Sequence, residues 1–322
     1  MFQCRAATIF AGIFLLATAL ACDERDAKST TNPSGSSTAP GARVTVASLV
    51  PAATDLIINM HAGDQLVAIS NYDPDRPETK GLPRVGDYLN NDWEKLAQVR
   101  PSVMITQYDP NRMPAGLRER ADELGIKLVN IKIERIDDIL AAIDLLGKTL
   151  NQPAKSQVAA EAMRVRLEAV RKRVASTPRV RTLVVLDDSG QSVAGPDTFL
   201  DDLVTIAGGA NVLAGNRNRY PRIDREMMVT LAPDAIIQLQ PEATPQRLEQ
   251  AKQFWQSVAS VPAVKNGRVY TFTDWYVLQP AFEMGELAEK FADVLHPANG
   301  AASDSKLPHP NPVPGGEGAR GR

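Results

Sequence analysis

The sequence predicts an α/β fold with two similar lobes, each containing a mostly parallel sheet, joined by a single long α-helix. Three observations lead to this prediction. Segments typical of strands alternate with segments typical of helices along most of the 322 residues, which indicates βαβ units and parallel sheets. A helical segment of unusual length lies near the middle of the chain. A block of sequence that precedes this segment returns in a similar form after it, and the chain is long enough to form two compact lobes.

The first residues predict export. Arg5 precedes an apolar run that is too short to span a bilayer comfortably, and a small-x-small cleavage site stands directly before Cys22. We therefore expect a signal peptide over residues 1–21 and acylation of Cys22, as in bacterial lipoproteins. Acylation would hold the protein on the periplasmic face of the inner membrane or the outer face of the cell membrane. Simple secretion after cleavage at Ala21 is the alternative.

Two polar segments flank the predicted lobes. Residues 22–42 and 297–322 are rich in small polar residues, Pro and Gly, and cannot bury enough apolar surface to fold by themselves. We expect a disordered tether at the N-terminus and a disordered tail at the C-terminus. The other cysteine, Cys4, belongs to the signal, so the exported chain has no pair of cysteines for a disulfide.

The predicted elements of the two halves follow a similar order of strands and helices, with one strand more in the first half. The first half gives strands at residues 43–49, 66–70, 102–106 and 127–131, with helices at 52–61, 92–99, 117–124 and 136–150. The second half gives strands at 180–186, 235–239 and 268–272, with helices at 197–207, 224–231, 245–257 and 281–295. A long loop rich in Pro, Gly and Asp follows the second strand of the first half at residues 71–91, and a loop containing Pro and Arg follows the first helix of the second half.

The segment of residues 154–176 predicts one long helix between these halves. Its apolar residues recur at spacings of four, four, three and four and form a single stripe: Ala159, Met163, Leu167, Val170 and Val174. Pro153 marks its start and Pro178 its end. This pattern alone favours a crossover helix inside one α/β domain.

An internal repeat favours two lobes over one domain. The block DWEKLAQVRPSVMI, residues 92–105, and the block DREMMVTLAPDAII, residues 224–237, share Asp, Glu, Pro and Ile at a constant offset of 132. Chance is the alternative, since a capped helix before a strand is common in α/β proteins. We predict lobes at residues 43–150 and 178–296, with the bridging helix at 151–177.

Composition and motifs argue against several functions. The net charge is −2 and no basic stripe is present, so nucleic acid is not an expected partner. The three histidines, His61, His296 and His309, are too few and too scattered for a bare metal ion, and we predict neither a metal nor a cofactor. The sequence has no G-x-S-x-G, P-loop or G-x-G-x-x-G motif, so we predict no catalytic activity.

Four stretches resemble the class III substrate-binding proteins of ABC importers, which bind ferric siderophores, haem or cobalamin. They are VASLVPAATDLIINMHAGDQLVAIS, LPRVGDYLNNDWEKLAQVRPSVMITQ, AGPDTFLDDLVTIAGGANVLAG and YPRIDREMMVTLAPDAII. The segment TFTDWYVLQPA is similar to that of the cobalamin-binding members. The resemblance implies a monomer that captures cobalamin or a related corrinoid between its lobes and delivers it to a permease dimer with its ATPase. Ferric siderophore or haem is the alternative ligand, and a periplasmic enzyme on the same scaffold is the alternative class.

Glu94 and Glu226 are the candidates for permease docking. Each is expected in the first turn of a short helix, at equivalent positions of the two lobes. The resemblance implies that these carboxylates pair with arginines of the permease. The alternative is that each glutamate only complements the positive end of its helix dipole.

The candidates for ligand binding follow predicted strands. The expected ends of parallel strands are where open α/β sheets bind ligands, and a flat or bulky ligand could stack on aromatic side chains there. The candidates are Tyr72, Tyr88, Tyr108, Tyr220 and Trp275, with Asp274 as a hydrogen-bond acceptor. Packing beneath loops is the alternative for each aromatic, and capping of a turn is the alternative for Asp274.

Overall fold

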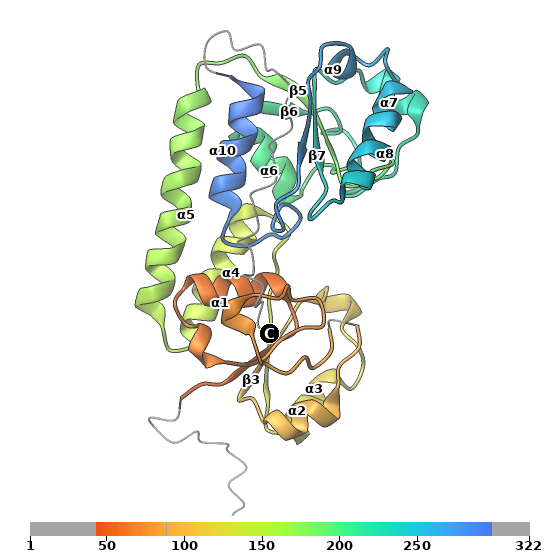
Figure 1. Ribbon diagram of the computed structural model, residues 1–322. Helices are drawn as coiled ribbons and strands as arrows, with labels where there is room; N and C mark the ends of the chain where they lie inside the picture. Colours follow the sequence, from red (N-terminus) through yellow and green to blue (C-terminus); the bar gives the residue numbers. More distant parts are fainter. Residues whose placement is uncertain (1–42, 88, 298–322) are drawn as a thin grey trace, which may run out of the picture. The chain divides into compact units, whose positions relative to one another are not determined.

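The computed structural model describes residues 43–87 and 89–297, which belong to one compact unit. Its first half contains a parallel sheet with the strand order β2-β1-β3-β4 (Figure 1). The strands are short and consist mainly of buried apolar residues, as expected for a sheet covered on both faces. They are β1 (Val46–Ser48), β2 (Leu66–Ala68), β3 (Val103–Thr106) and β4 (Lys127–Asn130).

Helices cover both faces of this first sheet. The helices are α1 (Pro51–Asn59), α2 (Trp93–Val99), α3 (Leu117–Glu123) and α4 (Ile136–Thr149). The side chains of α1 and α4 pack with Val46, Val103 and Ile105 on one face. The side chains of α2 and α3 pack with Ala47 and Met104 on the other face. Alternate strand residues therefore face opposite helix layers.

The second half repeats this plan. Its parallel sheet has the order β6-β5-β7-β8, with α6 and α10 on one face and α7, α8 and α9 on the other. The strands are β5 (Val180–Val185), β6 (Gly209–Asn211), β7 (Ala235–Leu239) and β8 (Val269–Phe272). The helices are α6 (Phe199–Ile206), α7 (Arg225–Leu231), α8 (Pro245–Gln256), α9 (Pro262–Lys265) and α10 (Met284–Leu295).

The repeat at an offset of 132 extends to backbone detail. The side chains of Asp92 and Asp224 cap α2 and α7 by accepting the amide N–H three residues later. Both helices end on a residue with left-handed backbone, Arg100 with φ 50° and Ala232 with φ 44°. A proline follows each of these residues and begins the approach to β3 or β7. The two lobes are therefore equivalent in backbone conformation as well as in strand order.

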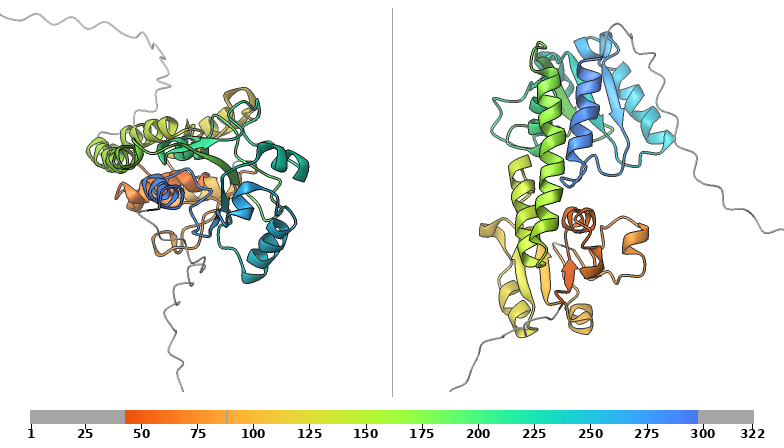
Figure 2. Two further views of the ribbon diagram at one scale, coloured as in Figure 1. Left: turned by 90° about the horizontal axis from the view of Figure 1, so that it is seen from above. Right: turned by 90° about the vertical axis from the view of Figure 1, so that its left-hand side faces the viewer.

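The long helix α5 (Pro153–Val174) joins the lobes, as predicted. It packs against α4 in the first lobe and α10 in the second, and runs beside both in Figures 1 and 2. All five residues of the predicted stripe are buried. They belong to one continuous apolar core that includes side chains from both lobes. No helix in the described part of the chain is both long and apolar enough to cross a bilayer.

Two elements were not predicted. Strand β6 follows Gly208, which has a φ of 81° and turns the chain out of α6. Gly209, directly after Gly208, already pairs with Val180 of β5. The other element, α9, is a single turn that begins at Pro262. In addition, α6 begins at Phe199 with Thr198 as its cap, whereas we expected helix from Asp197, whose φ is 59°.

Candidate ligand-binding site

Segments that follow the strands of one lobe contact segments that follow the strands of the other lobe. Glu134, between β4 and α4, pairs with Arg219, between β6 and α7, at 3.3 Å. We call this region of contact between the lobes the seam. At a second place in the seam, the Phe282 N–H, from the loop after β8, donates to Asp55 of α1 at 3.2 Å. Because parallel strands all end at one edge of a sheet, the carboxyl edges of the two sheets face this seam. Such edges are where α/β proteins bind ligands.

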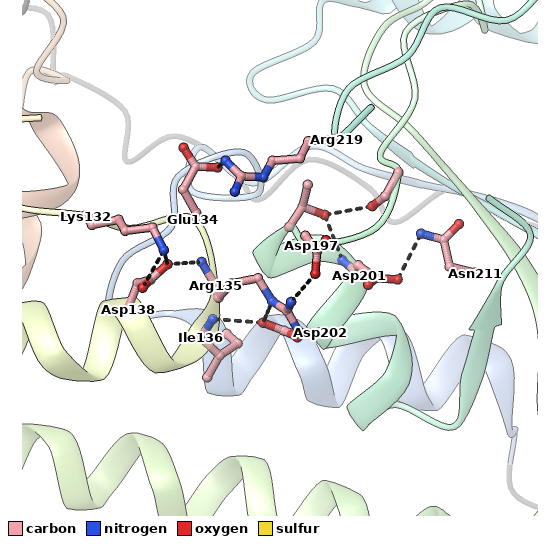
Figure 3. A network of polar contacts seen from close by, with 12 residues as sticks. Lys132, Glu134, Arg135, Ile136, Asp138, Asp197, Asp201, Asp202, Asn211 and Arg219 are labelled. Carbon is pink, nitrogen blue, oxygen red and sulfur yellow. Dashed lines mark hydrogen bonds and ion pairs between the residues drawn. The ribbon is translucent and has the colours of Figure 1, made fainter. Parts of the chain in front are cut away.

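Arg135 donates three hydrogen bonds to carboxylates across the seam (Figure 3). Its guanidinium donates through Nε to Asp202 Oδ2 at 2.8 Å and through Nη2 to the second oxygen, and through Nη1 to Asp197 at 2.7 Å. Asp202 also accepts the N–H of Ile136 at 2.9 Å. A carboxylate of the second lobe therefore caps helix α4 of the first lobe. Hydrogen bonding to Asp202, supported by the nearby negative charges, raises the pKa of Arg135.

A buried charged group forms another part of the seam. Asp55 has no exposed side-chain surface and pairs with Arg76 Nη1 at 2.8 Å. Arg76 belongs to the loop after β2, and its guanidinium lies 4.9 Å from the centroid of the Trp275 ring, which follows β8. Glu283, the residue before α10, is also largely buried. Burial and the charge of Asp55 raise the pKa of Glu283 to about 8.

Three of the predicted ligand residues lie in loops after strands of their own lobe. Tyr72, after β2, is 65% exposed, and Tyr220, after β6, is 49% exposed. Tyr108, after β3, is held by Asn130, which accepts its backbone N–H at 2.7 Å and donates to its carbonyl oxygen at 2.9 Å. Burial raises the pKa of the Tyr108 hydroxyl, so it is a hydrogen-bond donor at neutral pH.

The remaining predicted residues differ in their surroundings. Trp275 lies against a residue of the other lobe, Arg76. Tyr220 lies near Glu134 of the other lobe, and burial together with the charge of Glu134 raises the pKa of Tyr220. Asp274 pairs with Lys290 of α10 at 2.9 Å, so its carboxylate already has a partner. Among the described residues, no aromatic pair joins Trp275 to the candidate tyrosines. Tyr88 and Cys22 lie outside the described residues.

Two cavities found in the described residues have walls formed by other residues. A cavity of about 440 Å³ lies between the start of α4, the end of α5 and α6, and includes Asp202 and Arg179 in its wall. A cavity of about 550 Å³ lies under the loop after β2 and is lined by Arg76, Leu82 and Arg84. Neither has a predicted ligand residue in its wall. No group of metal-ligating side chains suited to an ion occurs in residues 43–87 and 89–297.

Glu94 and Glu226 are exposed at equivalent positions of α2 and α7. These helices cover the sheet faces that point away from α5, because α5 belongs to the core on the other face of each sheet. Neither carboxylate has an ion-pair partner in the described part of the chain. Exposed apolar side chains lie close in sequence: Leu89 before Glu94, and Met227 and Val229 after Glu226.

Sequence reasoning missed Asp55, Arg76 and Glu283. Asp55 gave a usable signal, because it is a single acid within an apolar helix, and such a residue needs a buried partner. Arg76 lies in a loop rich in Pro and Asp that we described only as long. Its ion-pair partner Asp55 lies in α1 of the same lobe and Trp275 lies in the other lobe, so no spacing in the sequence indicates this arrangement.

Two α/β lobes of equivalent topology, one bridging helix and facing carboxyl edges define a solute-binding protein that holds its ligand between lobes. The chain belongs to the periplasmic binding protein family, whose profile matches residues 46–275. This confirms the family expected from the sequence. The family is one of binding proteins and functions outside the cytoplasmic membrane.

Individual relatives agree with this family. The vitamin B12-binding protein of Yersinia pestis (strain Pestoides F) is 27% identical over 220 residues, covering 68% of this chain and 76% of the relative. The structure of the periplasmic vitamin B12-binding protein BtuF of Vibrio cholerae aligns with a TM-score of 0.66 and 23% identity over 78% of this chain and 96% of its own. The periplasmic haem-binding protein HutB of Vibrio cholerae aligns with a TM-score of 0.68 and 22% identity over 80% and 100%.

Proposed function

We propose that this protein is the solute-binding component of an ABC importer and that its ligand is cobalamin or a related corrinoid. The observation that carries the proposal is the pair of facing carboxyl edges, with Trp275 on the seam and Tyr72, Tyr108 and Tyr220 on the loops around it. A large planar ligand would bury much of its surface against such aromatic side chains. The 27% identity to a vitamin B12-binding protein supports corrinoids as the ligand class.

Haem is the second candidate ligand, and ferric siderophores are the third. The TM-score of HutB, 0.68, is as high as that of BtuF, 0.66, so the backbone alone does not separate haem from cobalamin. The side chains on the seam decide between them. In all three cases the protein binds and delivers its ligand without transforming it, and a periplasmic enzyme on the same scaffold is the competing class.

Titration of the protein with cyanocobalamin, haem and a ferric hydroxamate siderophore tests the proposal. We expect one-to-one, saturable binding of cyanocobalamin, measured by calorimetry, with haem and the siderophore binding more weakly. Replacing the exposed Tyr220 with Ala should weaken binding roughly twofold to tenfold, as expected for loss of one stacking contact. The control is Leu145→Ala, which removes an exposed apolar side chain on α4. Failure of all three ligands to bind would eliminate the proposed ligand classes.

The proposal includes a membrane anchor at Cys22 and a permease dimer as the partner. The signal and the cleavage motif support export, and the position of Cys22 directly after that motif supports acylation. A soluble periplasmic form is the alternative. Labelling of cells with a radioactive fatty acid, with Cys22→Ala as the comparison, distinguishes the two, because only the anchored form incorporates label.

A further inference from the structure

Arg76 is fixed in the seam by Asp55, which has no other ion-pair partner among the described residues. Asp55 is completely buried, and the Arg76 side chain keeps only 14% of its surface exposed. An unpaired carboxylate at such a place would be strongly destabilising. The second oxygen of Asp55 accepts the Phe282 N–H from the other lobe. The carboxylate therefore locates the guanidinium and the chain before α10 at the same time.

The guanidinium has one further partner, the indole ring of Trp275. The distance of 4.9 Å to the ring centroid is within the range of a cation–π interaction, and tryptophan is the best aromatic partner for one. Among the described residues, Nε and Nη2 of Arg76 are buried without a hydrogen-bond acceptor. The ring of Trp275 also meets Tyr276 edge-on, at 5.7 Å and 88°. Arg76 and Tyr276 thus hold this ring from two directions.

The balance of charges around Arg76 favours a lasting contact between its guanidinium and the Trp275 ring. Asp55 and Glu283 are acidic, and Arg76 is the cation that pairs with Asp55 and lowers the pKa of Glu283 through its charge. Asp73 and Arg84 of the first lobe lie close by and hold the same loop, since the Arg84 guanidinium donates to the carbonyl oxygens of Ser70 and Asp73 at 2.8 Å. With Glu283 neutral at pH 7, Asp55 and Arg76 form a balanced pair. The guanidinium is therefore free to interact with the indole ring.

We propose that Arg76 is a positioning residue for ligand binding: anchored by Asp55 of its own lobe, it sets the orientation of Trp275 across the seam and covers part of that ring, so that a planar ligand stacks on the remaining surface. This inference rests on the proposed function, because it takes Trp275 as a ligand-stacking residue. It adds a residue from the first lobe to the part of the site formed by the second. The competing interpretation is that Arg76 only helps the lobes adhere.

A double-mutant cycle separates these interpretations. The variants are Arg76→Gln, Trp275→Leu and the combination, titrated with cyanocobalamin. We expect Arg76→Gln alone to weaken cyanocobalamin binding about tenfold. In the Trp275→Leu background its effect should be less than twofold, because Arg76 acts on the ligand only through the indole ring of Trp275. Arg76→Lys should retain part of the affinity, since it keeps the charge but loses the planar guanidinium. Lys80→Gln, an exposed position in the same loop, is the matched control.

A ligand-free readout makes the test independent of the proposed function. The emission of Trp275 is obtained as the difference between each protein and its Trp275→Leu counterpart. We expect Arg76→Gln to shift this emission to longer wavelength and to increase its quenching by acrylamide, with an unchanged circular-dichroism spectrum. Unchanged Trp275 emission, or equal effects of Arg76→Gln in both backgrounds of the cycle, would overturn the positioning role. If the wild type binds no ligand while the emission shifts as expected, the proposed ligand fails and the positioning of Trp275 stands.

Discussion

At the scale of single residues, Glu283 has the most strongly raised carboxyl pKa in the described part of the chain. Desolvation is the largest cause of its high pKa, and the negative charge of Asp55 adds to it. Arg76 acts in the opposite direction but is already paired with Asp55. Glu283 is therefore neutral at pH 7 in the folded protein. Its ordinary pKa of 4.5 applies to the unfolded chain, in which it is ionised at the same pH.

This difference predicts a stability that falls as the pH rises. Between pH 4.5 and about pH 8, folded Glu283 holds a proton that the unfolded chain has released, so each step to higher pH favours unfolding. We expect the melting temperature of the wild type to fall from pH 5 to pH 8 by roughly 3–8 °C more than that of Glu283→Gln. The glutamine variant keeps a neutral group at all pH values. Thermal unfolding followed by circular dichroism gives both curves.

Asp73 provides an internal check on this comparison. Burial raises the pKa of Asp73 to about 6. Its titration therefore also lowers the stability as the pH rises, over a lower pH range, and does so in the wild type and in Glu283→Gln alike. Subtracting the two curves of melting temperature against pH removes the contribution of Asp73. Parallel curves from pH 5 to pH 8 would show that Glu283 does not hold a proton in the folded state.

At the scale of elements, the sequence predicts those parts that carry their own signals. The period of the apolar residues in α5, the Asp caps of α2 and α7 and the β-branched runs of β5 and β7 are all local. Strand β6 has the sequence Gly-Ala-Asn, which has little strand propensity, and it forms because β5 offers it a free edge. Tertiary pairing, not local preference, creates this element.

The same distinction applies to the candidate site. The candidate residues could be placed after strands because parallel strands end at one edge of a sheet. The contact between Asp55 and Phe282 joins residues 227 positions apart, and that of Arg76 with Trp275 likewise crosses from lobe to lobe. These contacts depend on how the lobes meet, which the sequence of either lobe alone does not encode. The seam of the site therefore had to be found in the structure.

Helix α5 approaches its neighbours closely where these carry glycine. A Cβ added at Gly147 of α4 would lie 2.0 Å from Ser156 Oγ and 2.3 Å from its Cβ. We expect Gly147→Ala to destabilise the protein by about 1–3 kcal/mol, because the overpacking outweighs the roughly 1 kcal/mol that alanine gains in a helix. Urea denaturation measures this change.

Two further variants identify the cause of that loss. Combining Gly147→Ala with Ser156→Gly moves the small residue to the facing helix and should restore most of the stability. Gly215→Ala, at a site with no atoms within 4 Å of the added Cβ, should cost little. A fully stable Gly147→Ala protein would mean that the two helices are not in such close contact.

At the scale of the whole molecule, the repeat gives each lobe one helix with an exposed glutamate. Both helices lie on the sheet face away from α5, and one apolar core connects α5 with both lobes. The ion pair between Arg135 and Asp202 joins the lobes at a second place. These connections restrict changes in the spacing between Glu94 and Glu226. A fixed spacing is what docking on a two-fold permease requires.

We therefore predict that charge reversal at both glutamates separates transport from ligand binding. Glu94→Arg together with Glu226→Arg should lower uptake of cyanocobalamin by cells at least about tenfold, because the docking hypothesis pairs these carboxylates with arginines of the permease and the variant would bring like charges together. Affinity for the ligand should stay within about twofold of the wild type, since both residues lie outside the seam. Each single variant should have an intermediate effect.

The matched control is Glu119→Arg with Glu249→Arg, which makes the same change in net charge at exposed positions of α3 and α8. Normal uptake by the Glu94 and Glu226 double variant, or an equal loss in the control, would refute the docking role, because bulk charge and not these two positions would then govern transport.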